Sequence, residues 1–195
     1  MTKIGFWLEV IGWKLLHLVR FSKHFLPISR VDLLADISLR LLYAHGIRGV
    51  ILDLDNTIVS EDDRYASPEA EAWIDTAKRA SFKLLILTNG KREGRIDYWT
   101  KRLGVPAIHP ARKPFPKAFR QALNRMQLKP HQVVVIGDSL HTDQLGAWFV
   151  GCPMIQVASL PHPKRSWERV IGRVVHRSYP RDRELWTITD GNVNC

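Results

Sequence analysis

The stretch from Val50 to Thr57 constrains the fold more than any other part of the chain. Val50 to Leu52 is a short apolar run typical of a buried strand, and it ends directly on Asp53. Asp55 and Thr57 follow at alternate positions. An ionised carboxylate at the end of an apolar strand is costly to bury without a partner. A divalent cation beyond the strand ends of an open α/β sheet would be such a partner.

Three interpretations of this stretch can be weighed from the residues alone. The first is a loop with two solvated aspartates. The second is the start of an EF-hand, since Asp53, Asp55 and Thr57 occupy its positions 1, 3 and 5. That motif fails because its glycine is replaced by Ile58 and its closing glutamate by Arg64. The third is a phosphotransfer aspartate, which requires polar partners further along the chain.

The remaining sequence alternates apolar strands with helical segments. We predict strands at 50–52, 83–87, 105–108, 133–136 and 154–157, and helices at 31–45, 68–80, 91–102 and 115–126. Such alternation gives a parallel sheet with right-handed crossovers. We therefore expect an α/β fold, with a doubly wound, Rossmann-like parallel sheet of about five strands.

The expected domain covers residues 31–178, with an amphipathic helix in residues 1–30 before it and a loosely ordered tail in residues 179–195 after it. Charges within Ile4–Phe21 argue against a secretion signal or a membrane span. Wound as a helix, this segment is apolar on one face and largely basic on the other. It is expected to lie in a membrane interface or, alternatively, to pack on its own domain.

The charge of the chain is unusual and uneven. The net charge is +10, which favours a negatively charged partner. Residues 51–75 hold eight acids and one base, whereas residues 91–125 hold ten bases and two acids. These stretches are interpreted either as two halves of one phosphate site or, for much of the basic one, as solvated helix faces. Two distant cysteines exclude a disulfide framework and suit a reducing compartment.

Polar groups recur at the predicted strand ends and helix starts. They are Asp53-Leu54-Asp55-Asn56-Thr57, Thr88-Asn89, Lys113-Pro114, and Gly137-Asp138 with Asp143. In this order they resemble the four motifs of the haloacid dehalogenase (HAD) superfamily of phosphotransferases, over about residues 47–158. Ala-Arg-Lys-Pro and Gly-Asp-x-x-x-Thr-Asp-x-x-Gly are further similar to the YqeG-like group of subfamily IIIA, whose relatives include phosphatidylglycerophosphate phosphatases. His141 departs from this pattern, because an apolar residue is expected there.

The resemblance implies a catalytic role for four residues, and their chemistry agrees. Asp53 is the expected nucleophile, because a carboxylate attacks phosphorus without prior deprotonation. Asp55 is expected to protonate the leaving alkoxide and then to activate water. Thr88 and Lys113 are expected to hold the transferring oxygens.

The same resemblance implies a metal and further contacts. Mg²⁺ is expected to bind Asp53, the backbone carbonyl of Asp55, and Asp138. Asp143 is expected to orient Lys113 or metal-bound water. Residues expected to contact the substrate are Asn89 and Arg112.

The motif spacing predicts the absence of a cap domain, because only one helix and one strand fit between successive motifs after Thr57. An open site suits a bulky substrate, and we expect an anionic phospholipid, with phosphatidylglycerophosphate implied by the resemblance. The protein is then expected to be cytoplasmic and peripheral on the inner face of a membrane. Alternatives are a capless phosphatase of nucleic-acid ends or phosphoproteins, and a non-catalytic membrane adaptor. No nucleic-acid partner is expected, since no binding motif accompanies the basic stretch.

Overall fold

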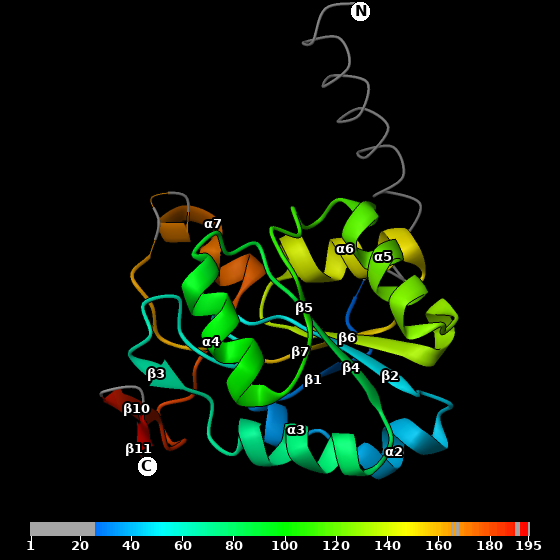
Figure 1. Ribbon diagram of the computed structural model, residues 1–195. Coiled ribbons are helices and arrows are strands. Elements are labelled where there is room, and N and C mark those ends of the chain that lie inside the picture. Colours follow the sequence, from blue (N-terminus) through cyan, green and yellow to red (C-terminus); the bar gives the residue numbers. More distant parts are fainter. Residues whose placement is uncertain (1–25, 165, 167, 190–191, 195) are drawn as a thin grey trace, which may run out of the picture.

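A parallel sheet forms the centre of the protein in the computed structural model, which describes residues 26–164, 166, 168–189 and 192–194 (Figure 1). The strand order is β1-β7-β6-β2-β4-β5, and all neighbouring strands are parallel. Their bounds are β1 Ser29–Arg30, β2 Gly49–Leu52, β4 Lys83–Leu87, β5 Ala107–Ile108, β6 Val133–Gly137 and β7 Met154–Gln156. The fold is therefore α/β and Rossmann-like, as predicted.

Helices cover both faces of this sheet (Figure 1). On one face lie α2 (Leu39–Ala44), α3 (Ala70–Arg79) and α4 (Glu93–Leu103), whose Leu42, Trp73 and Trp99 share one apolar core with β2. On the other face lie α5 (Pro116–Met126) and α6 (Leu145–Val150), which pack through Phe119 and Ala147. The last helix is α7 (Glu168–Val175). Shorter turns are η1 Leu34–Asp36, η2 Pro130–Gln132 and the π-helical η3 Leu140–Gln144.

The helix boundaries follow local chemistry. Helix α5 begins at Pro116, where a missing backbone N–H costs nothing. Helix α4 is followed by Gly104, whose φ of 59° is a left-handed conformation that glycine adopts without strain. Predicted strands 83–87, 133–136 and 154–157 match β4, β6 and β7 to within a residue.

Two elements before β2 differ from the sequence-based expectations. Strand β1 adds a sixth strand, in which Ser29 and Arg30 pair with β7 at the sheet edge. It was not predicted because its two residues are exposed and form no apolar run. The predicted helix at 31–45 is confined to η1 and α2.

The tail beyond Pro180, expected to be loosely ordered, contains two strands. β10 (Trp186–Thr189) pairs antiparallel with both β11 (Asn192–Asn194) and β3 (Tyr65–Ala66). The partly buried side chain of Ile188 packs against the main core, which explains why the β10 segment lies against the rest of the domain. A second small sheet joins β8 (Ala158–Ser159) to β9 (Arg177–Ser178).

Only a few helices and strands lie between successive motifs in the described part of the chain. Residues 58–87 form β3, α3 and β4, and residues 90–112 form α4 and β5. No cap domain is present in the described part of the chain, as expected. The predicted amphipathic helix at Ile4–Phe21 lies outside the described residues. Within them, no helix is long and apolar enough to cross a membrane.

Candidate active site

A polar pocket of about 550 Å³ opens at the carboxyl ends of the central strands. Asp53 directly follows β2, Thr88 follows β4, and Asp138 follows β6. Lys113 enters the pocket from the segment before α5. The pocket is lined by acidic, basic and amide groups, including Asp53, Asp55, Asn89, Lys91, Arg92, Arg95, Lys113, Asp138, His141, Glu168 and His176.

Lys113 is buried between two carboxylates. Its Nζ lies 2.6 Å from Oδ1 of Asp53 and 2.7 Å from Oδ1 of Asp143. Burial alone would lower the pKa of Lys113, but the carboxylates of Asp143 and Asp53 raise it above its ordinary value. The lysine therefore remains a cation, fixed beside the carboxylate expected to be the nucleophile.

Asp53 lies in surroundings that disfavour its negative charge. Burial raises the pKa of Asp53 well above its usual range, the neighbouring Asp143 adds to this, and Lys113 opposes it. The carboxylate also accepts a hydrogen bond of 2.8 Å from the backbone N–H of Leu54. Asp53 would thus be stabilised by one further positive charge nearby.

A cluster of buried carboxylates indicates where such a cation would bind. Oxygen atoms of Asp53, Asp138 and Asp143 lie within 4.8 Å of one another. Carboxylate oxygens are the ligands that hard divalent cations prefer, so the donor set fits a metal such as Mg²⁺. Asp143 can approach because Gly137 has no side chain: a Cβ there would lie 2.6 Å from the Asp143 carboxyl group.

Asp138 is oriented by contacts from β7 and from the residue that follows α7. Its Oδ2 lies 3.0 Å from Nδ1 of His176, and its backbone carbonyl accepts a hydrogen bond of 2.9 Å from Nε2 of Gln156. Burial favours the neutral acid, but the hydrogen bond with His176 lowers the pKa of Asp138. Asp138 is therefore held as an anion, ready to bind a cation.

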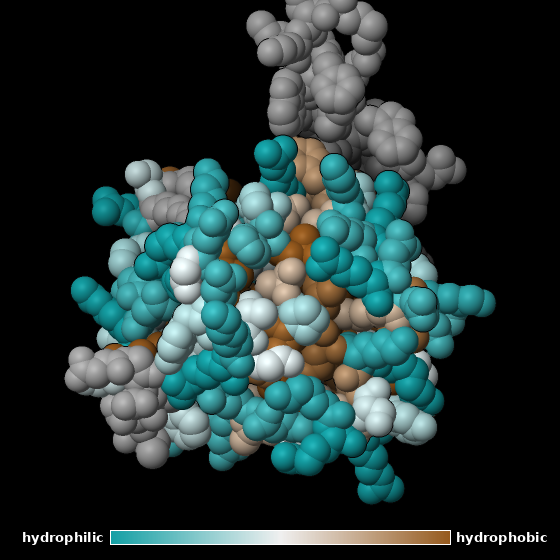
Figure 2. Space-filling view, in the orientation of Figure 1, coloured by the Kyte–Doolittle hydropathy of each residue, from teal (hydrophilic) through white to brown (hydrophobic). Residues whose placement is uncertain are grey.

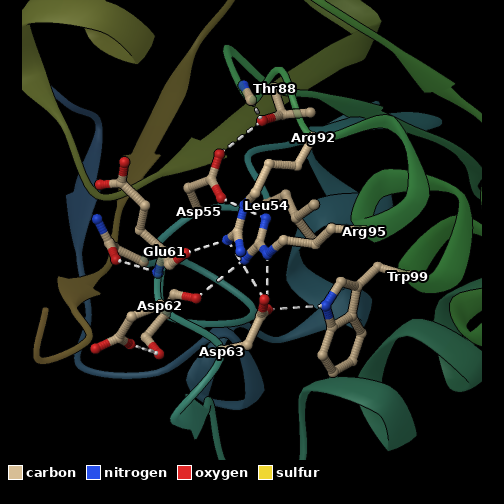
Figure 3. A network of polar contacts seen from close by, with 12 residues as sticks. Leu54, Asp55, Glu61, Asp62, Asp63, Thr88, Arg92, Arg95 and Trp99 are labelled. Atoms are coloured by element: carbon tan, nitrogen blue, oxygen red, sulfur yellow. Dashed lines mark hydrogen bonds and ion pairs between the residues drawn. The ribbon is translucent and has the colours of Figure 1, made fainter. Parts of the chain in front are cut away.

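The carboxylate of Asp55 takes part in a different set of contacts (Figure 3). Its Oδ2 accepts a hydrogen bond of 2.7 Å from the hydroxyl of Thr88, and its Oδ1 lies 2.7 Å from Nη1 of Arg95. Thr88 in turn accepts a bond of 2.9 Å from the backbone N–H of Gly90. Both oxygens of the Asp55 carboxylate are thus engaged, one by Thr88 after β4 and the other by Arg95 in α4.

Arg95 joins Asp55 to the loop that follows β2. The guanidinium also donates to Oδ1 of Asp63 at 2.6 Å and to the carbonyl of Ser60 at 3.0 Å. The indole N–H of Trp99 donates to the same Asp63 oxygen at 3.3 Å. Only 8% of the Arg95 side chain is exposed. The loop, helix α4 and Asp55 are therefore fixed relative to one another, as Figure 3 shows.

The two residues predicted to contact substrate differ in placement. Asn89 lines the pocket and holds the backbone of Lys113, since its Oδ1 accepts from the Lys113 N–H at 2.6 Å and its Nδ2 donates to the Lys113 carbonyl at 3.1 Å. Arg112 is exposed and is not among the residues that line the pocket. The peptide unit of Lys113 is thus held by Asn89, whereas the side chain of Arg112 lies outside.

His141, the departure from the expected motif, also lines the pocket. Its Nδ1 lies 2.6 Å from the hydroxyl oxygen of Ser139, and its ring centre lies 5.6 Å from that of His176. Burial lowers the pKa of His141, and the nearby His176 adds to this effect. The histidine pair forms the wall of the pocket beside Asp138.

One pocket is lined by five of the predicted residues, Asp53, Asp55, Asn89, Lys113 and Asp138. Two more are buried, Thr88 bonded to Asp55 and Asp143 bonded to Lys113. Sequence reasoning missed Arg95 and His176, which orient Asp55 and Asp138. Arg95 lies within the basic stretch already noted, and Asp63 lies within the acidic one. The complementary charges of these two stretches were the sequence signal that could have indicated a contact between them. His176 lies 33 residues beyond Asp143 of the last motif, and no spacing rule predicts it.

The sheet order, the polar pocket at the strand ends and the acidic cluster place the chain in the class of Rossmann-like α/β proteins with an acidic site at one sheet edge. Residues 36–147 match the family model of haloacid dehalogenase-like hydrolases. The chain belongs to this haloacid dehalogenase-like hydrolase family.

A curated relative agrees with this assignment. The chain is 40% identical over 125 residues to the "Probable phosphatase YqeG" of Bacillus subtilis (strain 168), covering 64% of this chain and 72% of that protein. Among solved structures, a "putative HAD family hydrolase" from Streptomyces avermitilis has a TM-score of 0.49 and 18% identity, with 61% of this chain and 71% of that chain covered. The 3-deoxy-D-manno-octulosonate 8-phosphate phosphatase of Yersinia pestis has a TM-score of 0.48 and 19% identity, with 73% and 77% covered.

Proposed function

We propose that this chain hydrolyses phosphate monoesters through an aspartyl-phosphate formed on Asp53. One observation carries the proposal: Asp53 borders an open pocket while paired at 2.6 Å with the buried Nζ of Lys113. A carboxylate fixed beside a cation can attack phosphorus while the cation stabilises the charge of the transferring oxygens. The YqeG relative is named as a phosphatase, which supports the same chemistry.

In the proposed first step, an oxygen of Asp53 forms a bond to phosphorus and the ester P–O bond breaks. Asp55 gives a proton to the departing alkoxide. In the second step, a water molecule attacks the phosphorus, Asp55 removes its proton, and the acyl–phosphate bond breaks to release phosphate and restore Asp53. Thr88 and Arg95 hold Asp55 in place between these steps.

Asp53, Asp138 and the backbone carbonyl of Asp55 are the proposed Mg²⁺ ligands, and Asp143 is proposed to orient Lys113. Bound Mg²⁺ would neutralise phosphate charge and balance the buried carboxylates. Asp143 belongs to the same carboxylate cluster and also accepts a hydrogen bond of 2.7 Å from Nζ of Lys113. Its proposed role is therefore to orient this lysine.

We further propose a phospholipid substrate, phosphatidylglycerophosphate, and a peripheral location on the inner face of a membrane. Three features support this. The motif resemblance extends to relatives with that activity. Within the described residues no cap domain covers the pocket, and Lys91 and Arg92, which line it, suit a polyanionic head group.

The test is phosphate release from a panel of substrates at equal concentration with Mg²⁺: phosphatidylglycerophosphate in mixed vesicles, a sugar phosphate, an oligonucleotide with a terminal phosphate, and a phosphopeptide. We expect the lipid to give the highest kcat/KM and Asp53→Asn to abolish all turnover. Preference for the oligonucleotide or the phosphopeptide would retain the chemistry and overturn the lipid substrate. Undiminished release by Asp53→Asn would overturn the mechanism.

A further inference from the structure

Helix α7 exposes an aliphatic strip to solvent. Val170 is 83% exposed, Val174 is 74% exposed and Ile171 is 49% exposed. Residues three and four positions apart lie on the same side of a helix, so Val174 adjoins both of the others. Contiguous exposed aliphatic side chains are unfavourable in water and mark surfaces that bind another apolar phase.

Positive charges border this strip. Arg169 and Arg173 are exposed on the same helix, one turn apart, and Lys164 is exposed shortly before it. A short helix with aliphatic side chains on one side and arginines beside them is typical of a segment that lies in a bilayer interface. The basic residues select an anionic surface, at about 1 kcal/mol for each Lys or Arg near it.

The helix is also part of the pocket wall. Glu168 at its start and His176 just after its end both line the pocket. Nε2 of Gln156 in β7 donates to the Val175 carbonyl at 3.3 Å, and Ser139 and His176 are joined by a backbone bridge. In Figure 1, α7 lies at the upper left of the molecule and α2 at the lower right. A surface that binds α7 would therefore lie next to the pocket opening.

We propose that α7 is the docking surface for an anionic bilayer, with Val170, Ile171 and Val174 entering the interface and Arg169 and Arg173 facing the head groups. This inference rests on the proposed function and deepens it, because it identifies the surface that brings the pocket to a phosphorylated lipid. It does not depend on Ile4–Phe21, since every residue that carries it belongs to α7 or to the segment beside it.

The test uses the full chain with one environment-sensitive thiol label. Cys195→Ser removes one native thiol, and Cys152 stays unlabelled because it is buried and burial raises its pKa to about 12. The probe is attached at Val174→Cys. The matched control is Leu41→Cys on α2, an apolar residue that is 60% exposed at the other end of the molecule. Vesicles of phosphatidylglycerol are compared with vesicles of phosphatidylcholine.

We expect phosphatidylglycerol vesicles to shift the emission to the blue and at least double its intensity at position 174, with no change at position 41 and little response to phosphatidylcholine. The variant Val170→Ser with Val174→Ser should keep normal hydrolysis of p-nitrophenyl phosphate. It should lose at least fivefold in turnover of phosphatidylglycerophosphate in vesicles.

Several results would overturn the docking proposal. One is an unchanged probe at position 174 while the protein still sediments with vesicles. Another is a probe at position 174 whose emission is already blue-shifted without lipid. A shift that is the same at all protein concentrations would mean that Ile4–Phe21 covers α7. A shift that grows with protein concentration would mean that a second copy of the chain covers it. A blue shift at position 174 together with no hydrolysis of any phosphate ester would support the docking surface and overturn the proposed function instead.

Discussion

The side chain of Arg95 donates hydrogen bonds to three different residues. Its guanidinium holds Asp55, Asp63 and the carbonyl of Ser60, and each bond has a charged donor. Such bonds are about twice as strong as neutral ones, and a misplacement of 1 Å at a catalytic group can cost about 10²-fold in rate. We therefore assign Arg95 as the positioning residue for Asp55.

Replacing Arg95 by Met keeps the length of the side chain and removes its donors. We expect kcat to fall about 10–100-fold, measured as phosphate release from p-nitrophenyl phosphate. A purely structural defect would also lower the rate, so a rescue experiment is needed beside this measurement. The matched control is Arg102→Met on the same helix, because Arg102 pairs with Glu71 at 2.7 Å outside the pocket.

Added guanidinium ion separates the two explanations further. It should restore part of the rate of Arg95→Ala and leave Arg102→Ala unaffected. A normal rate for Arg95→Met would show that Asp55 needs no support from α4.

At the scale of elements, the contact between α5 and α6 supports the loop that carries Asp143. Helix α6 continues directly from η3, which contains Asp143, and Gly146 in α6 faces the Phe119 ring in α5. A Cβ at Gly146 would lie 2.2 Å from Phe119. This close approach is what places η3 over the end of β6.

The variant Gly146→Ala should therefore lower the free energy of unfolding by about 1–3 kcal/mol through overpacking, measured by urea denaturation. Gly94 in α4 is the matched control, because a Cβ there meets nothing within 4 Å. Gly94→Ala should raise stability by about 0.4–1 kcal/mol. Equal effects at both positions would contradict the proposed α5–α6 contact.

Sequence patterns predicted the elements with strong periodicity and missed those held by pairing alone. The strand β4 has a run of apolar residues, and α3 and α5 each present one apolar face, so all three were predicted to within about two residues. Strand β1 has two exposed residues, and β10 depends on β3, more than a hundred residues away in the chain. No local pattern encodes a partner at that distance.

At the scale of the whole molecule, the acidic and basic stretches meet. Arg95 binds Asp55 and Asp63, and Arg102 binds Glu71, so α4 neutralises the loop and helix that follow β2. Figure 2 shows hydrophilic side chains over most of the face that carries α4. The motifs predicted which residues gather at the strand ends, but part of the basic stretch serves structure rather than substrate. That division depends on side-chain geometry, which spacing does not specify.

The buried carboxylate cluster makes a prediction about metal and stability. Mg²⁺ that binds the folded chain alone stabilises it by mass action, by about 2.7 kcal/mol at a hundred times its Kd. We expect Mg²⁺ to raise the Tm in a thermal denaturation series and EDTA to reverse the rise. Asp138→Asn should abolish the dependence on Mg²⁺. The control Asp75→Asn should retain it, because Asp75 is exposed on α3 and pairs there with Lys78 at 2.7 Å. A Tm of Asp138→Asn that still rises with Mg²⁺ would contradict the ligand role of Asp138.

The central claim is that phosphorus is transferred to Asp53, and the most direct test is to locate the phosphoryl group. The protein would be mixed with a ³²P-labelled phosphate ester, quenched in acid within the first turnover, and digested for peptide mapping. We predict a base-labile label on the peptide that contains Asp53 and no label in Asp53→Asn. A label on another residue, or full turnover with no labelled protein at any quench time, would contradict this account.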